Sequence, residues 1–177
     1  MNERIKKLLE GNERYQKTGI FRGDVSAAKR AENKDGQHPC AVVITCSDSR
    51  VIPEAIFSAG IGELFVIRTA GNVIGVHEFG SIEYAVEHLK AGTVIVLGHT
   101  GCGAVKAALA GEFGGTVGVI TNRIKNAAGD EQDPEKACAL NVKEGVEGIR
   151  RVFFHHEDVT VAGAIYDILS GEVRIIC

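Results

Sequence analysis

The sequence lacks the features of a membrane-spanning, secreted or nucleic-acid-binding protein. No apolar run approaches the ~18 residues needed to cross a bilayer, and residues 1–15 are charged and amphipathic, unlike a secretory signal. The formal net charge of −3 gives no electrostatic reason to expect nucleic acid. No repeat, low-complexity tract or linker interrupts the 177 residues. We therefore expect a single domain over 1–177, located in the cytoplasm, without membrane or nucleic-acid partners.

The cysteines lack the pattern of a disulfide framework. Their number is odd, and no secretory signal precedes them, which favours reduced thiols. The five are Cys40, Cys46, Cys102, Cys138 and Cys177. Only Cys46 and Cys102 have a metal-like context, and we expect the others to be small buried hydrophobes. A G-x-G-x-x-G fingerprint between the first strand and its helix is also missing, which disfavours a nucleotide-binding domain.

Short β-branched apolar runs alternate with helical patterns along the chain. The patterns predict strands over 41–46, 64–67, 93–97, 159–167 and 172–176, and helices over 3–16, 53–58, 77–90, 105–109, 117–128 and 134–154. This alternation indicates an α/β fold with a mostly parallel central sheet flanked by helices. The amphipathic helix over 3–16 lies outside the βα pattern, and we expect an amino-terminal helical arm free to contact a neighbouring subunit.

Two cysteine motifs follow two of the predicted strands. The first is Cys46-Ser47-Asp48-Ser49-Arg50, and the second is His99-Thr100-Gly101-Cys102-Gly103. In a parallel sheet, ligands bind beyond the carboxyl ends of the strands, where the strand order changes direction. Two thiolates and one imidazole suit Zn²⁺ with a fourth position left free. The sequence therefore predicts one Zn²⁺ per chain, bound by Cys46, His99 and Cys102.

The residues alone leave alternatives for this site. Asp48 could be a fourth zinc ligand, which would leave no water to activate, or Arg50 could hold it away and keep the fourth position open. The plainer interpretation is a solvated turn with a surface ion pair, beside a buried cysteine and a hydrogen-bonded histidine. The remaining histidines lack metal-like spacing and are expected to be surface or helix residues: His77, His88, His155 and His156.

These motifs closely resemble those of the β-class carbonic anhydrases. The matching segments are 46–53 (CSDSRVIP), 96–103 (VLGHTGCG), 65–68 with 70–72, and 82–86, within a similarity that spans residues 8–173. The resemblance implies a lyase that reversibly hydrates CO2 to bicarbonate and a proton through a metal-bound hydroxide. It also implies a zinc cofactor and self-association as a dimer or tetramer.

The resemblance also implies roles for single residues. Asp48 and Arg50 would form a dyad that keeps the fourth metal position open. As in the plant-like branch of the family, Gln37 would hydrogen-bond substrate or bicarbonate. Phe65 and Tyr84 would line an apolar CO2 pocket across the dimer interface, although on their own they are ordinary core residues. The last implied residue, which would place a backbone N–H near the metal, is Gly103.

One position departs from some bacterial members of that family. They have a tryptophan three residues before the first zinc cysteine, as part of a non-catalytic bicarbonate site that inactivates the enzyme. This chain has Val43 there and contains no tryptophan. The departure implies an open, active site at neutral pH. His38 could assist proton release, but an exposed histidine is the favoured interpretation.

Two rival functions use the same residues. A hydrolase for carbonyl sulfide or carbon disulfide would share the zinc ligands and differ in pocket access. A non-catalytic zinc or redox module would have a closed four-ligand site, or a disulfide between Cys46 and Cys102.

Overall fold

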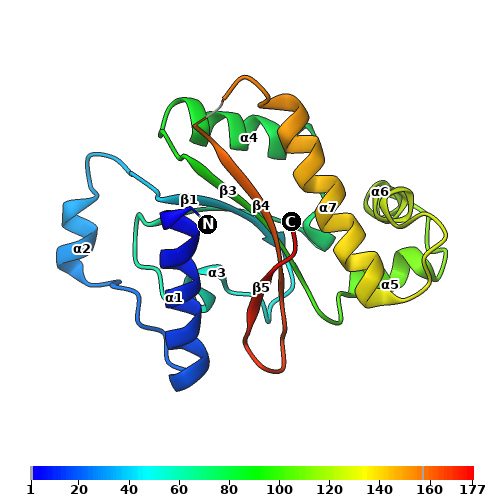
Figure 1. The fold of residues 1–177 in the computed structure, drawn as a ribbon, viewed down its shortest axis with the longest axis horizontal. Helices are drawn as coiled ribbons and strands as arrows, with labels where there is room; N and C mark the ends of the chain where they lie inside the picture. The colour runs from blue at the N-terminus through cyan, green and yellow to red at the C-terminus, as the bar shows by residue number, and fades with distance from the viewer. Residues whose placement is uncertain (1, 157) are drawn as a thin grey trace.

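The computed structural model describes residues 2–156 and 158–177, and it places helices on both faces of a five-stranded sheet (Figure 1). The strands are β1 (Ala41–Cys46), β2 (Leu64–Thr69), β3 (Thr93–His99), β4 (Thr160–Tyr166) and β5 (Val173–Ile175). The helices are α1 (Glu3–Thr18), α2 (Ala27–Glu32), α3 (Pro53–Ile56), α4 (Val76–Glu87), α5 (Gly103–Leu109), α6 (Gly118–Ala128) and α7 (Pro134–Val152), with a 3₁₀ turn η1 (Ala70–Asn72). The predicted α/β class is confirmed, and α2 and η1 are additions that the sequence patterns did not indicate. None of these helices is both long and apolar enough to cross a bilayer.

The order of the strands explains how two distant motifs meet. The sheet runs β2-β1-β3-β4-β5; the first four strands are parallel, and β5 is antiparallel to β4. The chain leaves β1 toward β2 on one side and returns to place β3 on the other side. The strand order therefore changes direction between β1 and β3, and the carboxyl ends of these two strands lie next to each other.

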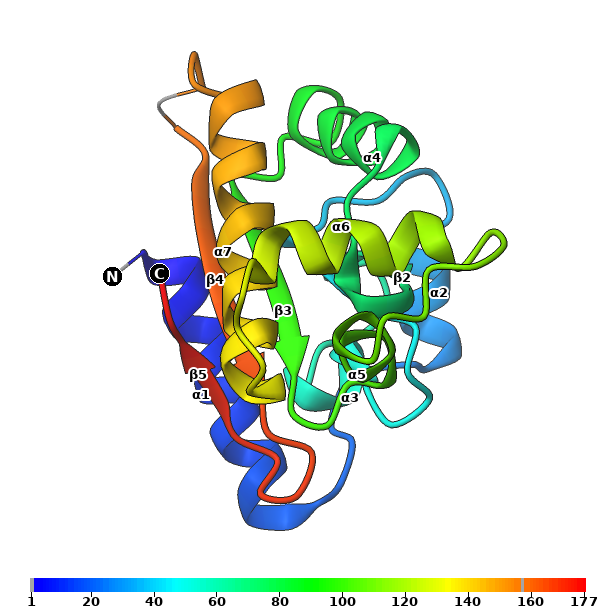
Figure 2. The ribbon, with the colours of Figure 1, turned by 90° about the vertical axis from the view of Figure 1, so that its right-hand side faces the viewer.

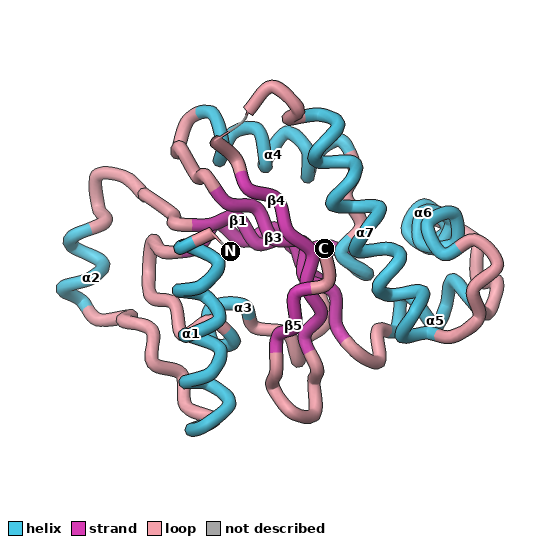
Figure 3. Tube along the Cα trace, viewed as in Figure 1, coloured by secondary structure: helices cyan, strands magenta, loops and turns pink. Residues whose placement is uncertain are grey.

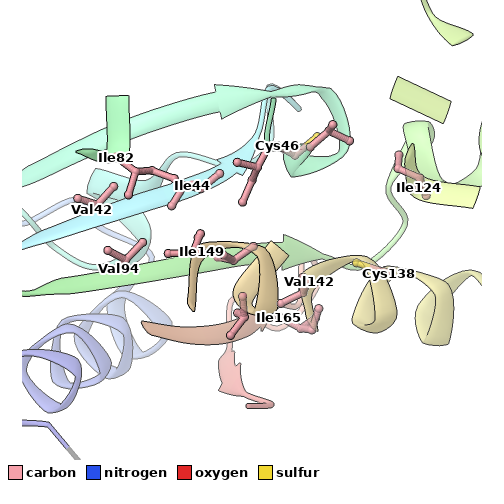
Figure 4. Packing of buried hydrophobic residues seen from close by; sticks show 14 of the residues in the cluster. Val42, Ile44, Cys46, Ile82, Val94, Ile124, Cys138, Val142, Ile149 and Ile165 are labelled. Atoms are coloured by element: carbon pink, nitrogen blue, oxygen red, sulfur yellow. The ribbon is translucent and has the colours of Figure 1, made fainter. Parts of the chain in front are cut away.

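The two central strands are buried along their whole length. Every residue of β1 and β3 is buried, because helices cover both faces of the sheet. On one face Val42, Ile44 and Val94 face Ile82 of α4 and Ile149 of α7 (Figure 4). On the other face, the strand residues Val43, Ile95 and Leu97 contact α1 and α3. Figure 2 shows the molecule turned by 90°, with α7 lying along the sheet.

The predicted amino-terminal helix is confirmed as α1, but it packs on its own chain and does not stand free. Its residues Ile5 and Leu8 are buried against the protein's own sheet and α3. The Asn12 amide donates hydrogen bonds to the carbonyls of Ile56 (3.2 Å) and Gly171 (2.8 Å). A Cβ at Gly11 would lie 1.9 Å from the Phe57 carbonyl oxygen, so this close approach requires glycine. The exposed segment is α2, which buries none of its residues and stands away from the sheet (Figure 3).

Candidate metal centre

Cys46, His99 and Cys102 meet where the sheet order changes direction. Cys46 ends β1, His99 ends β3, and Cys102 is the N-cap residue of α5. Their side chains are buried, and the three ligand atoms all lie within 4.8 Å of one another. The two sulfur atoms are 4.0 Å apart. A tetrahedral ion with Zn–S bonds of ~2.3 Å would hold two sulfurs about 3.8 Å apart, so the pair is spaced for a shared metal and too far apart for a disulfide.

Hydrogen bonds favour a thiolate at Cys46. The Cys102 thiol lies against it, and the backbone N–H groups of Gly71 (3.2 Å) and Asp48 (3.4 Å) donate to Cys46 Sγ. The hydrogen bond from Cys102, followed by the neighbouring His99 imidazole and then these amides, lowers the pKa of Cys46 despite its burial. The same interaction and burial raise the pKa of Cys102. A cation between the two sulfurs would favour the deprotonation of both.

The imidazole of His99 presents a free lone pair to the two sulfurs. Its Nδ1 lies 3.0 Å from the Thr100 carbonyl oxygen. Because a carbonyl can only accept, Nδ1 carries the proton, and Nε2 is left as the acceptor. Nε2 is buried and has no hydrogen-bond partner. A ligating histidine is oriented in this way, with its second nitrogen donating to a carbonyl. This buried nitrogen without a partner, beside two thiols, fits Zn²⁺.

Asp48 is held by Arg50 beside this ligand set. Arg50 Nε donates to Asp48 Oδ1 (2.9 Å), and Arg50 Nη2 donates to Asp48 Oδ2 (2.7 Å). This two-pronged contact holds the pKa of Asp48 well below its usual range. Asp48 Oδ2 lies 3.9 Å from His99 Nε2, yet the group of mutually close ligand atoms comprises Cys46, His99 and Cys102 without Asp48. Arg68 supports the loop by donating to the Asp48 carbonyl (2.8 Å).

Helix α7 supports the second motif loop and the turn η1 through residues that the sequence patterns did not indicate. Glu135 Oε1 accepts from the Gly101 N–H (3.1 Å), and the Cys138 thiol donates to the His99 carbonyl (3.4 Å). Asn141 Nδ2 donates to the Gly71 carbonyl (2.8 Å). Spaced three residues apart, these side chains share one face of the helix. In the sequence, only Asn141 could have indicated this support, because it is a polar residue among the apolar residues of the helix face that is buried.

Gly71 connects α7 to the first cysteine. Its φ of 65° lies in the left-handed region, and a Cβ there would be 2.6 Å from Ile124 Cδ1. Only glycine fits both the conformation and the space. Gly71 donates its N–H to Cys46 Sγ and accepts from Asn141 through its carbonyl. An Asn141–Gly71 contact therefore fixes an N–H that points at a ligand sulfur.

The predicted substrate residues are not brought to this site within one chain, except for Gly103. Gly103 is the first residue of α5, next to Cys102. Gln37 precedes β1 and is exposed, while Phe65 pairs in register with Val42. Four strand residues, about 13 Å, therefore separate Phe65 from the level of Cys46. The Phe65 ring lies 6.3 Å from that of Tyr84, which is 48% exposed, so these two do form a pair.

Comparison with known proteins agrees with this geometry. A family model described as carbonic anhydrase matches residues 41–173. Carbonic anhydrase 2 of Mycobacterium tuberculosis is 49% identical over 159 residues, which cover 89% of this chain and 73% of that protein. The β-carbonic anhydrase of Coccomyxa, solved with acetazolamide, superposes with a TM-score of 0.75 at 26% identity, covering 97% of this chain and 86% of that one.

A further structure shows the same fold. A tetrameric β-carbonic anhydrase of Sordaria macrospora superposes with a TM-score of 0.76 at 24% identity, covering 99% of this chain and 98% of that one. From the family match and these likenesses, the chain belongs to the β-carbonic anhydrase family. It is a carbonate dehydratase, a lyase, and the general reaction of its family is the hydration of CO2. The family prediction made from the two cysteine motifs is confirmed.

Proposed function

We propose that Cys46, His99 and Cys102 bind one Zn²⁺ per chain and that this site carries out the reversible hydration of CO2 to bicarbonate and a proton. The observation that carries the proposal is the buried His99 Nε2, which lacks a partner beside two sulfurs 4.0 Å apart. Bound zinc lowers the pKa of a water ligand to about 7, so hydroxide is available near neutral pH. The chain's own residues bind the ion, hold the site open and position the reactants.

Asp48 and Arg50 have the role of keeping one position open. Arg50 engages both oxygens of the carboxylate, which keeps Asp48 ionised and turned toward the guanidinium. An ionised carboxylate at the edge of the site can accept a hydrogen bond from the nucleophile and orient its attack. Val43, which is fully buried in β1, stands where some bacterial relatives have tryptophan. We therefore propose a site that stays open and active at neutral pH.

Substrate binding is proposed to involve a second copy of the chain. Gln37, Phe65 and Tyr84 lie toward the opposite end of the strands from the chain's own ligand set, so a partner's copies would have to line the CO2 pocket. β2 is an edge strand whose residues are mostly half-buried, and Tyr84 is half exposed, which leaves an aromatic surface for such a partner. The tetrameric Sordaria macrospora relative also supports a dimer or tetramer. Gly103 is proposed to direct its N–H toward the bound reactant.

Stopped-flow CO2 hydration on protein of measured zinc content tests this function. We expect the rate above buffer to rise in proportion to zinc per chain, to vanish on chelation and to return when zinc is restored. A rate independent of zinc content would contradict the proposal. Carbonyl sulfide, tested on the same preparation, distinguishes the rival hydrolase, for which hydrolysis of that substrate would exceed CO2 hydration.

A cytoplasmic location is also proposed. The support is chemical: all five thiols are free, and Cys46, Cys102 and Cys138 are buried, which suits a reducing compartment. Cell fractionation with antibody detection tests it, and recovery outside the cytoplasmic fraction would refute it.

A further inference from the structure

A second group of metal-binding side chains lies at the opposite edge of the sheet. Glu87 is the last residue of α4, and His155 and His156 lie in the connection between α7 and β4. One carboxylate oxygen and two ring nitrogens from these residues all lie within 4.8 Å of one another. The sequence prediction for His155 and His156 as mere surface or helix residues is therefore incomplete. Only the fold brings the histidine pair to Glu87.

The side chains of Glu87, His155 and His156 point toward one another. His156 Nε2 lies 2.7 Å from Glu87 Oε1. Nevertheless Nε2 is buried and makes no hydrogen bond. The rings of His155 and His156 have their centroids 4.3 Å apart, so both imidazoles stand on the same side of the loop. A cation between the three groups would satisfy the buried nitrogen and the carboxylate together.

Space and charge around the group allow an ion with water. A cavity of ≈ 70 Å³ is lined by Glu87 and His156, with Lys90 and Asp158 adding one charge of each sign. His155 does not line this cavity, which offers space beside Glu87 and His156 for water that would complete the coordination of an ion. The His156 side chain is 19% exposed and that of Glu87 is 40% exposed, which leaves the group open to exchange with solvent.

The position of this group makes it independent of the Cys46–His99–Cys102 centre. The Thr160 N–H donates to the Gly92 carbonyl (3.0 Å), so the segments that carry the group meet at the amino ends of β3 and β4. His99 lies at the far end of β3, seven residues away. At ~3.3 Å per residue the two sets are about 20 Å apart. No residue is shared between them.

We propose that Glu87, His155 and His156 form a second divalent-cation site. Two imidazoles and one carboxylate suit borderline cations such as Zn²⁺, Co²⁺ or Ni²⁺ and not Ca²⁺ or Mg²⁺, which prefer oxygen alone. The bound cation would connect the end of α4 to the connection that leads into β4. Its effect is to hold these two segments together in the folded state only, and therefore to stabilise the fold.

Co²⁺ titration of protein that carries one zinc per chain, with excess zinc removed, tests the second site. Because zinc already occupies the thiolate set, we expect added Co²⁺ to bind with a stoichiometry of one and to give visible bands without a thiolate charge-transfer band. We expect His156→Ala and Glu87→Gln each to weaken this binding at least ~10-fold. The matched control is His77→Ala, an exposed histidine in the first turn of the same helix, which should bind Co²⁺ like the wild type.

A thermal readout separates binding from damage to the fold. Saturating Co²⁺ should raise the Tm of the wild type and of the His77→Ala variant but not that of Glu87→Gln, whose side chain keeps its size. Co²⁺-free melting of each variant checks that the fold is intact. No binding by the zinc-loaded protein, or equal affinity in wild type and Glu87→Gln, would overturn the proposal. Bands with thiolate character would do so too, because Co²⁺ would then occupy the first centre.

Discussion

The two edges of the parallel sheet hold groups of potential metal ligands in very different surroundings. At the carboxyl edge, Cys46, His99 and Cys102 are buried; the first two end strands, and Cys102 caps the start of α5. Backbone amides and α7 hold their loops in place. At the amino edge, Glu87, His155 and His156 are partly exposed, and the two histidines lie in a connecting segment. From this difference we expect burial and support to decide which group holds an ion more tightly. A supported set is ready before the ion arrives, whereas an exposed one must first be ordered.

The largest expected effect comes from removing a ligand at the carboxyl edge. Cys46→Ser should lose zinc and lower activity by more than ~100-fold, because changing even a partner of a ligand costs 10–100-fold. Zinc content and stopped-flow rates measure both quantities. Cys40→Ala is the matched control, since it removes a thiol outside the ligand set and should keep one zinc per chain. If Cys46→Ser retained zinc, Cys46 would not be a ligand, and the contrast drawn between the two edges of the sheet would be wrong.

Removing the carboxylate should separate metal binding from turnover. Asp48→Ala should retain zinc and lose activity by about 100-fold, the scale of a positioned acid–base or hydrogen-bonding group. Because Arg50 lowers the pKa of Asp48, this carboxylate is ionised throughout the neutral range. The loss should therefore be the same from about pH 6 to pH 9, well above the ordinary pKa of aspartate. Full activity, or a loss that disappears at one end of this range, would remove Asp48 from the mechanism.

Weakening the support of the site should have an intermediate effect. Asn141→Ala removes the donor to Gly71 and loosens the N–H that points at Cys46 Sγ. We expect zinc affinity to fall about 10-fold and the free energy of unfolding to fall by about 1–3 kcal/mol. Competition with a chelator and urea unfolding measure the two. Asn122→Ala removes a hydrogen bond within α6, to the Gly118 carbonyl, and should leave zinc affinity unchanged. Equal zinc affinity in both variants would mean that Asn141 has no influence on the ligands.

The smallest effect is expected at the aromatic pair near the amino edge. Tyr84→Phe keeps the ring beside Phe65 and removes only the hydroxyl, so metal content should not change and the rate should change by a few-fold at most. Zinc analysis and steady-state kinetics on the same sample check this. Loss of zinc from this variant would show that the two edges are coupled, contrary to the comparison above.

The strands could be predicted where burial alone decides the pattern. The runs in β1 and β3 are apolar at every position because both faces are covered, and their predicted starts agree with the structure. Helix α2 was missed because it has no buried residue and therefore no apolar period. Its start depends on a local cap, in which Ser26 accepts from the Lys29 N–H. Such a cap is a weaker signal than a stripe of apolar residues.

What the sequence could not supply were contacts made only by the tertiary fold. The apolar stripe of α1 predicts that one face is buried, but not whether the chain itself or a partner covers it. That Cys46, His99 and Cys102 meet could be predicted, because both motifs follow strands of a parallel sheet. The Asn141 contact with Gly71, and the meeting of His156 with Glu87, depend on how α7 lies across the sheet.

The row of Glu135, Cys138 and Asn141 on α7 has a consequence for motion as well as for structure. Glu135 and Cys138 anchor the His99–Gly101 segment and Asn141 anchors Gly71, so we expect the first two turns of α7 and these segments to open as one cooperative unit. Stripping the ion from the protein should then accelerate amide hydrogen exchange in those turns. Exchange at the far end of the helix, near Ile149, should stay slow.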